Sequence, residues 1–169
     1  MSELLDALPD RIEHAARDVL ERACALDVSI VTAESCTGGL LASLLTDVEG
    51  ASHAFERGFV VYTDEAKAEL LGIAPALIAQ DGAVSRATAI AMAQGALARS
   101  RGDVAVSVTG FAGPGAPGDE PGLVHFACAR RDGPTTHREE HFGDVGRGAV
   151  RLACLDVSLA LLREAITGD

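Results

Sequence analysis

The sequence predicts an α/β fold: a three-layer α/β/α sandwich around a mixed β-sheet, formed as a single domain by residues 1–169. Three observations predict it. Short β-branched runs alternate along the chain with helical patterns, which is typical of strands and helices that alternate. The last two strand-like runs form a hairpin, which makes part of the sheet antiparallel. The chain has no repeat or linker, and 48% of its residues are hydrophobic, which suits one domain with a large core.

The first part of the chain supplies two helices and two strands. Residues 10–26 carry apolar side chains at helical spacing and predict an amphipathic helix. The β-branched run 28–32 predicts a short buried strand, and residues 33–37 predict a polar turn after it. An apolar helical pattern resumes over 38–46, and residues 55–62 predict a second strand.

A third helix is expected directly after the second strand. Thr63 or Asp64 is expected to cap it, because both residue types accept hydrogen bonds from the first free amides of a helix. The helix is expected to run through Lys67 and to end where Gly72 and Pro75 interrupt the pattern.

The second part of the chain supplies the rest of the sheet. Ser85 is expected to cap an Ala-rich helix that ends near Arg99. The remaining elements are a third strand over 104–109, a hairpin of 123–130 and 135–142, and a closing helix over 147–166. Between the third strand and the hairpin lies the glycine- and proline-rich stretch 110–122, which cannot form helix or strand. Loops of this length inside a compact domain are often functional.

Composition excludes several classes of protein. The formal net charge of −11 argues against sequence-independent nucleic-acid binding, which needs a basic surface. The chain has no apolar run long enough to span a bilayer and no basic stretch at its start typical of a signal peptide. Its four cysteines show no C-x-x-C spacing, so we expect reduced thiols in a cytoplasmic protein.

The segment Val31-Thr-Ala-Glu-Ser-Cys-Thr-Gly-Gly39 is the first candidate for chemistry. It passes from a buried strand to a helix start, which points backbone N–H groups outward from the sheet. Such a turn can bind an anion, or it can hold a nucleophile beside an oxyanion site. Ser35 and Thr37 are the candidate hydroxyls, and a purely structural N-capping role is the alternative.

A serine nucleophile needs a base, and Lys67 is the stronger candidate. It is the only lysine in a chain with thirteen arginines, so it is a candidate for a task that arginine cannot perform. As a base it must be uncharged, which requires burial to lower its pKa, helped by a cation such as Arg57. The five histidines are expected to be surface or structural residues. His137 and His141 share one face of a strand but lack a third ligand, so no metal site is expected.

Five runs in order along the chain resemble the CinA C-terminal domain family, over roughly residues 10–166. They are Ala33-Glu-Ser-Cys-Thr-Gly-Gly39, Gly50-Ala-Ser-His-Ala-Phe-Glu-Arg-Gly-Phe-Val-Val-Tyr62, Glu65-Ala-Lys67, Gly82-Ala-Val-Ser85 and Thr109-Gly-Phe-Ala-Gly-Pro114. Characterised members of that family are nicotinamide-nucleotide amidases. The resemblance implies that this chain hydrolyses the carboxamide of nicotinamide mononucleotide, a small nucleotide, to nicotinic acid mononucleotide and ammonia, with no cofactor.

The resemblance also implies roles for particular residues. Ser35 falls on the family's nucleophile and Lys67 on its base, so that the two form a Ser-Lys dyad. Tyr62 is expected beside the reacting amide, as a further catalytic residue. Amides near Thr37 and Gly38 are expected to form the oxyanion site. The substrate-binding residues expected from the matched runs are Thr37, Gly38, Gly39, Thr109, Gly110, Gly113 and Arg147.

The chain departs from the family pattern in two places. The loop after Pro114 lacks the usual Lys-Pro-Val-Gly, and the usual Gly-Asp-Arg is replaced by Gly143-Asp-Val-Gly-Arg147. A non-catalytic nucleotide-binding or partner-binding domain therefore stays open as an alternative, as does Cys36 as the nucleophile. The mean hydropathy of +0.21 in a small acidic domain favours a homo-oligomer.

Overall fold

Five strands form one mixed sheet in the computed structural model, which describes residues 8–51 and 53–168. The strand order is β2-β1-β3-β4-β5. Its strands are β1 (Ile30–Glu34), β2 (Phe55–Val60), β3 (Val104–Gly110), β4 (Leu123–Arg130) and β5 (Thr135–His141). Strand β1 pairs in parallel with β2 and β3, and the hairpin of β4 and β5 adds two antiparallel pairs. The predicted mixed sheet is confirmed.

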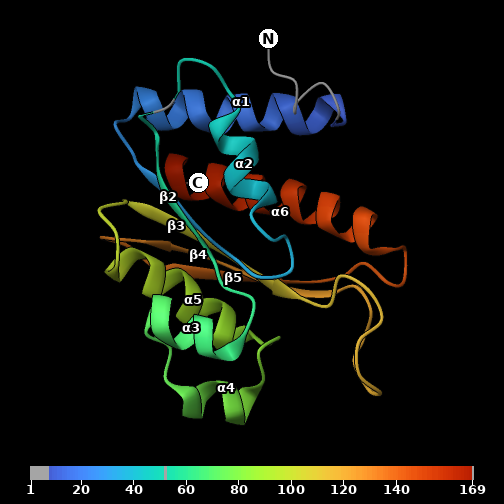
Figure 1. The fold of residues 1–169 in the computed structure, drawn as a ribbon. Coiled ribbons are helices and arrows are strands. Elements are labelled where there is room, and N and C mark those ends of the chain that lie inside the picture. The colour runs from blue at the N-terminus through green and yellow to red at the C-terminus, as the bar shows by residue number, and fades with distance from the viewer. Residues whose placement is uncertain (1–7, 52, 169) are drawn as a thin grey trace.

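Helices cover both faces of the sheet, as the sequence predicts (Figure 1). Three of them pack on one face: α1 (Asp10–Ala25), α2 (Leu40–Thr46) and α6 (Arg147–Thr167). The other three lie on the opposite face: α3 (Asp64–Leu71), α4 (Pro75–Asp81) and α5 (Arg86–Ala98). Each face has its own apolar core, so the three-layer architecture is confirmed. Within the described residues, none of the helices is long and apolar enough to cross a membrane.

Two details of the sequence prediction are wrong. Pro75 does not simply end the helical region; it occupies the first turn of α4, a helix that the pattern did not predict. Proline suits that position because its missing N–H would have no partner there in any case. The first strand runs over Ile30–Glu34 and not 28–32, so its buried stretch includes the polar residues Thr32 and Glu34.

The predicted helix starts on the α3–α5 face are confirmed. The Thr63 side chain accepts a hydrogen bond from the amide of Ala66, and the Ser85 side chain accepts one from Thr88. Both hydroxyls satisfy amides that an α-helix leaves free in its first turn. Lys67 therefore sits one turn into a helix whose start is fixed at the end of β2.

The topology places the end of β1 at a switch point in the sheet. The chain leaves β1 toward β2 and later crosses back to form β3 on the other side of β1. In open α/β sheets, a crevice forms outside the carboxyl ends of the strands where the direction of winding reverses, and ligands bind there. Ser35 follows β1 directly at this edge.

Candidate active site

A tight turn after β1 carries Ser35. The Ser35 amide donates to the carbonyl of Val108 at 3.0 Å, which continues the pairing of β1 with β3 by one residue. The chain then turns, with the Gly38 amide donating to the Ser35 carbonyl at 3.1 Å. Gly38 and Gly39 have φ values of +61° and +90°, a left-handed backbone that glycine adopts without steric cost. The two glycines thus let the chain enter α2 immediately after Ser35.

The side chain of Glu34 stabilises this turn through hydrogen bonds to the start of α2. Its side chain is fully buried, and its carboxylate accepts hydrogen bonds from three amides at the start of α2, those of Gly39, Leu41 and Ala42, at 2.8–3.2 Å. A helix start leaves such amides without partners, and a carboxylate there is also favoured by the helix dipole. Sequence reasoning missed Glu34, since a glutamate beside a polar turn is usually exposed.

We expect Glu34→Ala to lower the free energy of unfolding by about 2–4 kcal/mol, because it leaves three amides, one buried and two part-buried, without an acceptor. Denaturant unfolding of the purified protein measures this. Glu21→Ala on the exposed side of α1 is the control, expected within about 0.5 kcal/mol of the wild type. Equal stabilities of the two variants would contradict the anchoring role of Glu34.

Lys67 reaches Ser35 from the facing helix α3. Its Nζ lies 3.3 Å from Ser35 Oγ and donates to the Tyr62 carbonyl at 3.1 Å. The Lys67 side chain is only 1% exposed, and Ser35 is 7% exposed. Lys67 is among the largest fully buried side chains described, although lysine is almost never fully buried without a carboxylate partner. The predicted proximity of Ser35 and Lys67 is therefore present in the structure.

Burial is the main influence on the charge of Lys67. It lowers the pKa of the amine, because removal from water disfavours the charged form; the negative charges of Asp64 and Cys36 oppose the shift. The expectation that Arg57 assists is wrong. The Arg57 guanidinium instead pairs with Glu56 at 2.6 Å and donates to the carbonyl of Arg99.

Some amides of the turn already donate hydrogen bonds, and two do not. Gly38 donates to Ser35 and Gly39 to Glu34, so the expected role of the Gly38 amide as an oxyanion donor is not supported. Among the described residues, neither the Cys36 amide nor the Thr37 amide donates a hydrogen bond to another residue. The Thr37 carbonyl accepts a hydrogen bond at 2.8 Å from Nη2 of Arg151, which reaches across from α6. Sequence reasoning also missed this contact, which joins residues 114 positions apart.

Three other predicted residues are Thr109, Tyr62 and Gly110, of which Tyr62 contacts Lys67. Thr109 ends the buried part of β3, but its hydroxyl already donates to the Ala83 carbonyl at 2.7 Å. Tyr62 contacts Lys67 through its backbone carbonyl, and its ring is 70% exposed. Gly110 closes β3, where a Cβ would lie 2.6 Å from Val124, so only glycine fits without movement.

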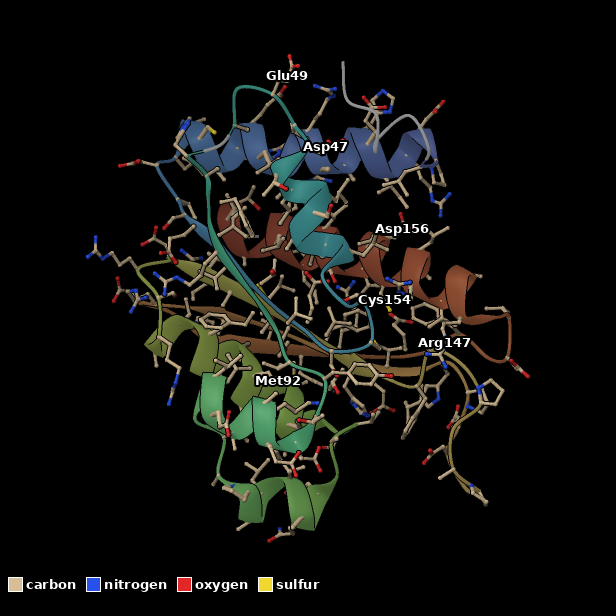
Figure 2. The ribbon with its side chains drawn as sticks, viewed as in Figure 1. Asp47, Glu49, Met92, Arg147, Cys154 and Asp156 are labelled. Atoms are coloured by element: carbon tan, nitrogen blue, oxygen red, sulfur yellow. The ribbon has the colours of Figure 1, made fainter. Side chains whose placement is uncertain are left out.

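The predicted Gly/Pro loop and the start of α6 lie together. Arg147 is the first residue of α6, and its guanidinium lies along Gly113: a Cβ on Gly113 would be 3.5 Å from Arg147 Nη2. Figure 2 shows Arg147 between this loop and α6. Gly110 is the last residue of β3, so the prediction of no strand over 110–122 is wrong for that residue; residues 111–122 form neither helix nor strand, as predicted. The exposed Arg147 side chain is thus available to an anion at this edge of the sheet.

Three of the five histidines, His125, His137 and His141, form a group on the β4–β5 hairpin. His125 and His137 stack with their ring centroids 5.3 Å apart, and His141 pairs with Glu120 and Glu139. No histidine hydrogen bonds to Ser35 or Lys67 in the described part of the chain. Residues 8–51 and 53–168 also hold no group of three His, Cys, Asp or Glu side chains that could bind a metal ion.

The chain is similar to known proteins over most of its length. The model of a family described as the CinA C-terminal domain matches residues 12–166. Nicotinamide-nucleotide amidohydrolase PncC of Escherichia coli strain K12 is 48% identical over 126 residues, which cover 73% of this chain and 75% of that protein. A competence-damage inducible protein of Caldicellulosiruptor bescii is 43% identical over 141 residues, 82% of this chain. The match spans only 34% of that longer relative.

Solved structures agree with the sequence comparisons. The crystal structure of competence/damage inducible protein CihA from Agrobacterium tumefaciens has a TM-score of 0.91 and 45% sequence identity, covering 95% of this chain and 98% of that one. The structure of an Escherichia coli CinA superfamily protein has a TM-score of 0.86 at 34% identity, covering 94% and 93% of the two chains. Family model, relatives and structures agree, and the chain belongs to the CinA C-terminal domain family.

Proposed function

We propose that this chain is a nicotinamide-nucleotide amidase that hydrolyses the carboxamide of nicotinamide mononucleotide through Ser35 and Lys67. One observation carries the proposal: an amine that is 1% exposed lies 3.3 Å from a serine hydroxyl at the switch point of the sheet. A buried lysine without a carboxylate partner is costly in a stable fold, and perturbed groups of this kind concentrate at functional sites. The 48% identity to a protein named for this activity supports the choice of substrate.

The first chemical step is attack by Ser35. Uncharged Lys67 Nζ takes the hydroxyl proton while Ser35 Oγ bonds to the amide carbon, which gives a tetrahedral intermediate with a negative oxygen. The Thr37 amide, free in the structure, is the donor we propose for that oxygen, in place of Gly38. Arg151 holds the Thr37 carbonyl and so fixes the orientation of the turn.

The second step releases ammonia. The Lys67 ammonium returns its proton to the amide nitrogen as the C–N bond breaks, which leaves an ester on Ser35. Water then attacks this ester with Lys67 again acting as base, and nicotinic acid mononucleotide departs. Tyr62, whose ring is exposed beside the pair, is proposed to line the mouth of the site where the pyridine ring lies.

Direct assay tests the proposal. Purified protein is incubated with nicotinamide mononucleotide, and ammonia and nicotinic acid mononucleotide are measured together, in equal amounts if the reaction is hydrolysis of the amide. Saturable binding of the nucleotide without either product would instead support the alternative of a non-catalytic binding domain. The altered loop and the residues 143–147 are the features that favour that alternative.

Arg147 is proposed to bind the nucleotide phosphate beside Gly110 and Gly113. We expect Arg147→Ala to raise KM for nicotinamide mononucleotide by about tenfold or more, because a charge-assisted hydrogen bond to phosphate is lost. Nicotinamide riboside, which lacks the phosphate, should be hydrolysed equally by variant and wild type. Arg17→Ala on α1 is the control. An equal loss with both substrates would show that Arg147 acts on something other than the phosphate.

We further propose that the protein is cytoplasmic and self-associates. Val60, which is 50% exposed, ends the edge strand β2, and Tyr62, which is 70% exposed, lies two residues beyond it. An exposed edge with apolar side chains favours pairing with a second copy. Light scattering after size-exclusion chromatography is expected to give at least a dimer, and a Val60→Lys variant is expected to shift it toward monomer. A wild-type monomer at all concentrations would contradict this proposal.

A further inference from the structure

Two of the four cysteines lie together behind the turn that carries Ser35. Cys36, half-buried, directly follows Ser35, and Cys154 is fully buried on α6 (Figure 2). Cys36 packs against the apolar core that contains Cys154, and each thiol is close enough to influence the pKa of the other. A second contact fixes the same arrangement: one helical turn before Cys154, Arg151 donates to the Thr37 carbonyl at 2.8 Å. This hydrogen bond holds helix α6 beside the turn, next to the two cysteines.

The surroundings give the two thiols different reactivities. The hydrogen bond from Cys154 lowers the pKa of Cys36, aided by the Cys36 amide and the charge of Arg151, against the effect of burial. The same hydrogen bond, together with burial, raises the pKa of Cys154. Cys36 is also the more exposed of the two. Thiolates and not thiols attack oxidants, and an oxidant must reach the sulfur, so Cys36 is the reactive member of the pair. Once Cys36 is oxidised, the neighbouring Cys154 can react with it to form a disulfide.

We propose that Cys36 and Cys154 are a redox-active dithiol that hydrogen peroxide converts into a disulfide. The Cys36 thiolate attacks one peroxide oxygen and the O–O bond breaks, which gives a sulfenic acid and, after proton uptake, water. The Cys154 sulfur then attacks the Cys36 sulfur, the S–O bond breaks, and a second water leaves. Two thiols lose two electrons and two protons, and the peroxide gains them.

The disulfide changes the geometry beside Ser35. An S–S bond is about 2.05 Å long, much shorter than the separation of hydrogen-bonded sulfurs, so the turn and α6 must approach each other. Ser35 is joined to Cys36 by one peptide bond, so its hydroxyl moves relative to Lys67, now 3.3 Å away. Because misplacement by about 1 Å can cost about 100-fold in rate, we expect the linked form to react at least about tenfold more slowly.

Peptide mapping tests the dithiol directly. The reduced full chain is treated with hydrogen peroxide, unfolded with iodoacetamide present, and digested without reductant. The expected product is a Cys36–Cys154 linked peptide that dithiothreitol separates, with Cys24 and Cys128 alkylated. Burial raises the pKa of Cys128 to about 12, which keeps that thiol unreactive in the folded chain. Linkage to Cys24 or Cys128, linkage between two chains, or an unmodified Cys36 would overturn the proposal.

Two variants separate the dithiol from general oxidation. In Cys154→Ala the linked peptide should be absent, and dimedone should trap Cys36 as its sulfenic acid. In the matched control Cys24→Ser, at a half-buried position on α1, the linked peptide should form as in the wild type. A dimedone-negative Cys36 in Cys154→Ala would show that Cys36 is not the thiol that peroxide attacks, which contradicts the proposed order.

The effect of the disulfide on the rate of hydrolysis is measured in a separate experiment, since it rests on the proposed amidase function. Nicotinamide mononucleotide hydrolysis should fall at least about tenfold as the linked peptide accumulates and return after dithiothreitol. An unchanged rate in fully linked protein would overturn the influence on the site. The peptide map decides the dithiol itself whether or not the chain hydrolyses the nucleotide, so failure of one proposal is distinguishable from failure of the other.

Discussion

Replacing Ser35 with alanine is expected to lower kcat for nicotinamide mononucleotide by about 10⁴-fold or more, because the variant has no oxygen to attack the amide. The fold should be unaffected. Ser35 is anchored through its backbone, by the amide bonded to Val108 and the carbonyl bonded to Gly38, and alanine keeps both contacts. Nucleotide binding should therefore persist while ammonia release is lost, and calorimetry with a release assay measures the two separately.

A control and a competing nucleophile sharpen this experiment. Ser43→Ala, at an exposed position on α2, should hydrolyse the nucleotide at the wild-type rate. Cys36 is the alternative nucleophile, because it is adjacent to Ser35 and its pKa is lowered by the hydrogen bond from Cys154. If Ser35→Ala kept its activity and lost it only on alkylation of Cys36, the thiol and not the hydroxyl would carry the reaction.

Most of the fold follows from local patterns in the sequence. Helices and strands were recognised where apolar periodicity and capping residues agree, as at Thr63 and Ser85. The errors arise where one residue type is compatible with two different local structures. Proline both stops a helix and begins one, and at Pro75 the second applies. At the end of β1, burial extends through a glutamate that composition alone would place in the turn.

The two proposed catalytic residues could be predicted from the sequence, but the residues that hold the turn in place could not. Ser35 and Lys67 could be paired from sequence, because each follows a strand and carboxyl ends of neighbouring parallel strands share an edge. Their separation of 3.3 Å depends on how α3 packs, which no local pattern gives. Glu34 and Arg151 were missed because their importance comes from tertiary contacts with the turn, one of them over 114 positions.

Replacing Lys67 with methionine should have opposite effects on activity and on stability. We expect kcat to fall by about 10²–10⁴-fold, because the base that accepts the Ser35 proton is gone. Lys67→Arg should lose as much, since a guanidinium stays protonated at any accessible pH. Glu69→Met, exposed on the same helix, is the control for an added methionine and should keep its rate. Wild-type rates in both Lys67 variants would exclude the dyad.

The stability of Lys67→Met should differ from the wild type in a pH-dependent way. Burial lowers the pKa of Lys67 in the folded chain below the value of about 10.4 that lysine has when unfolded. Between these two pKa values the unfolded chain binds a proton that the folded chain does not. The wild type therefore gains up to about 1.4 kcal/mol of unfolding free energy per unit rise in pH, and loses it as the pH falls.

Methionine has no proton to bind, so the variant lacks this slope. Lys67→Met should be more stable than the wild type at neutral pH, and its advantage should shrink as the pH approaches that of free lysine. Denaturant unfolding of both proteins at several pH values measures the difference, which other titrating groups leave unchanged because the two chains share them. Parallel profiles would mean that Lys67 keeps its proton when folded. It could not then act as the base, even though its Nζ lies 3.3 Å from Ser35 Oγ.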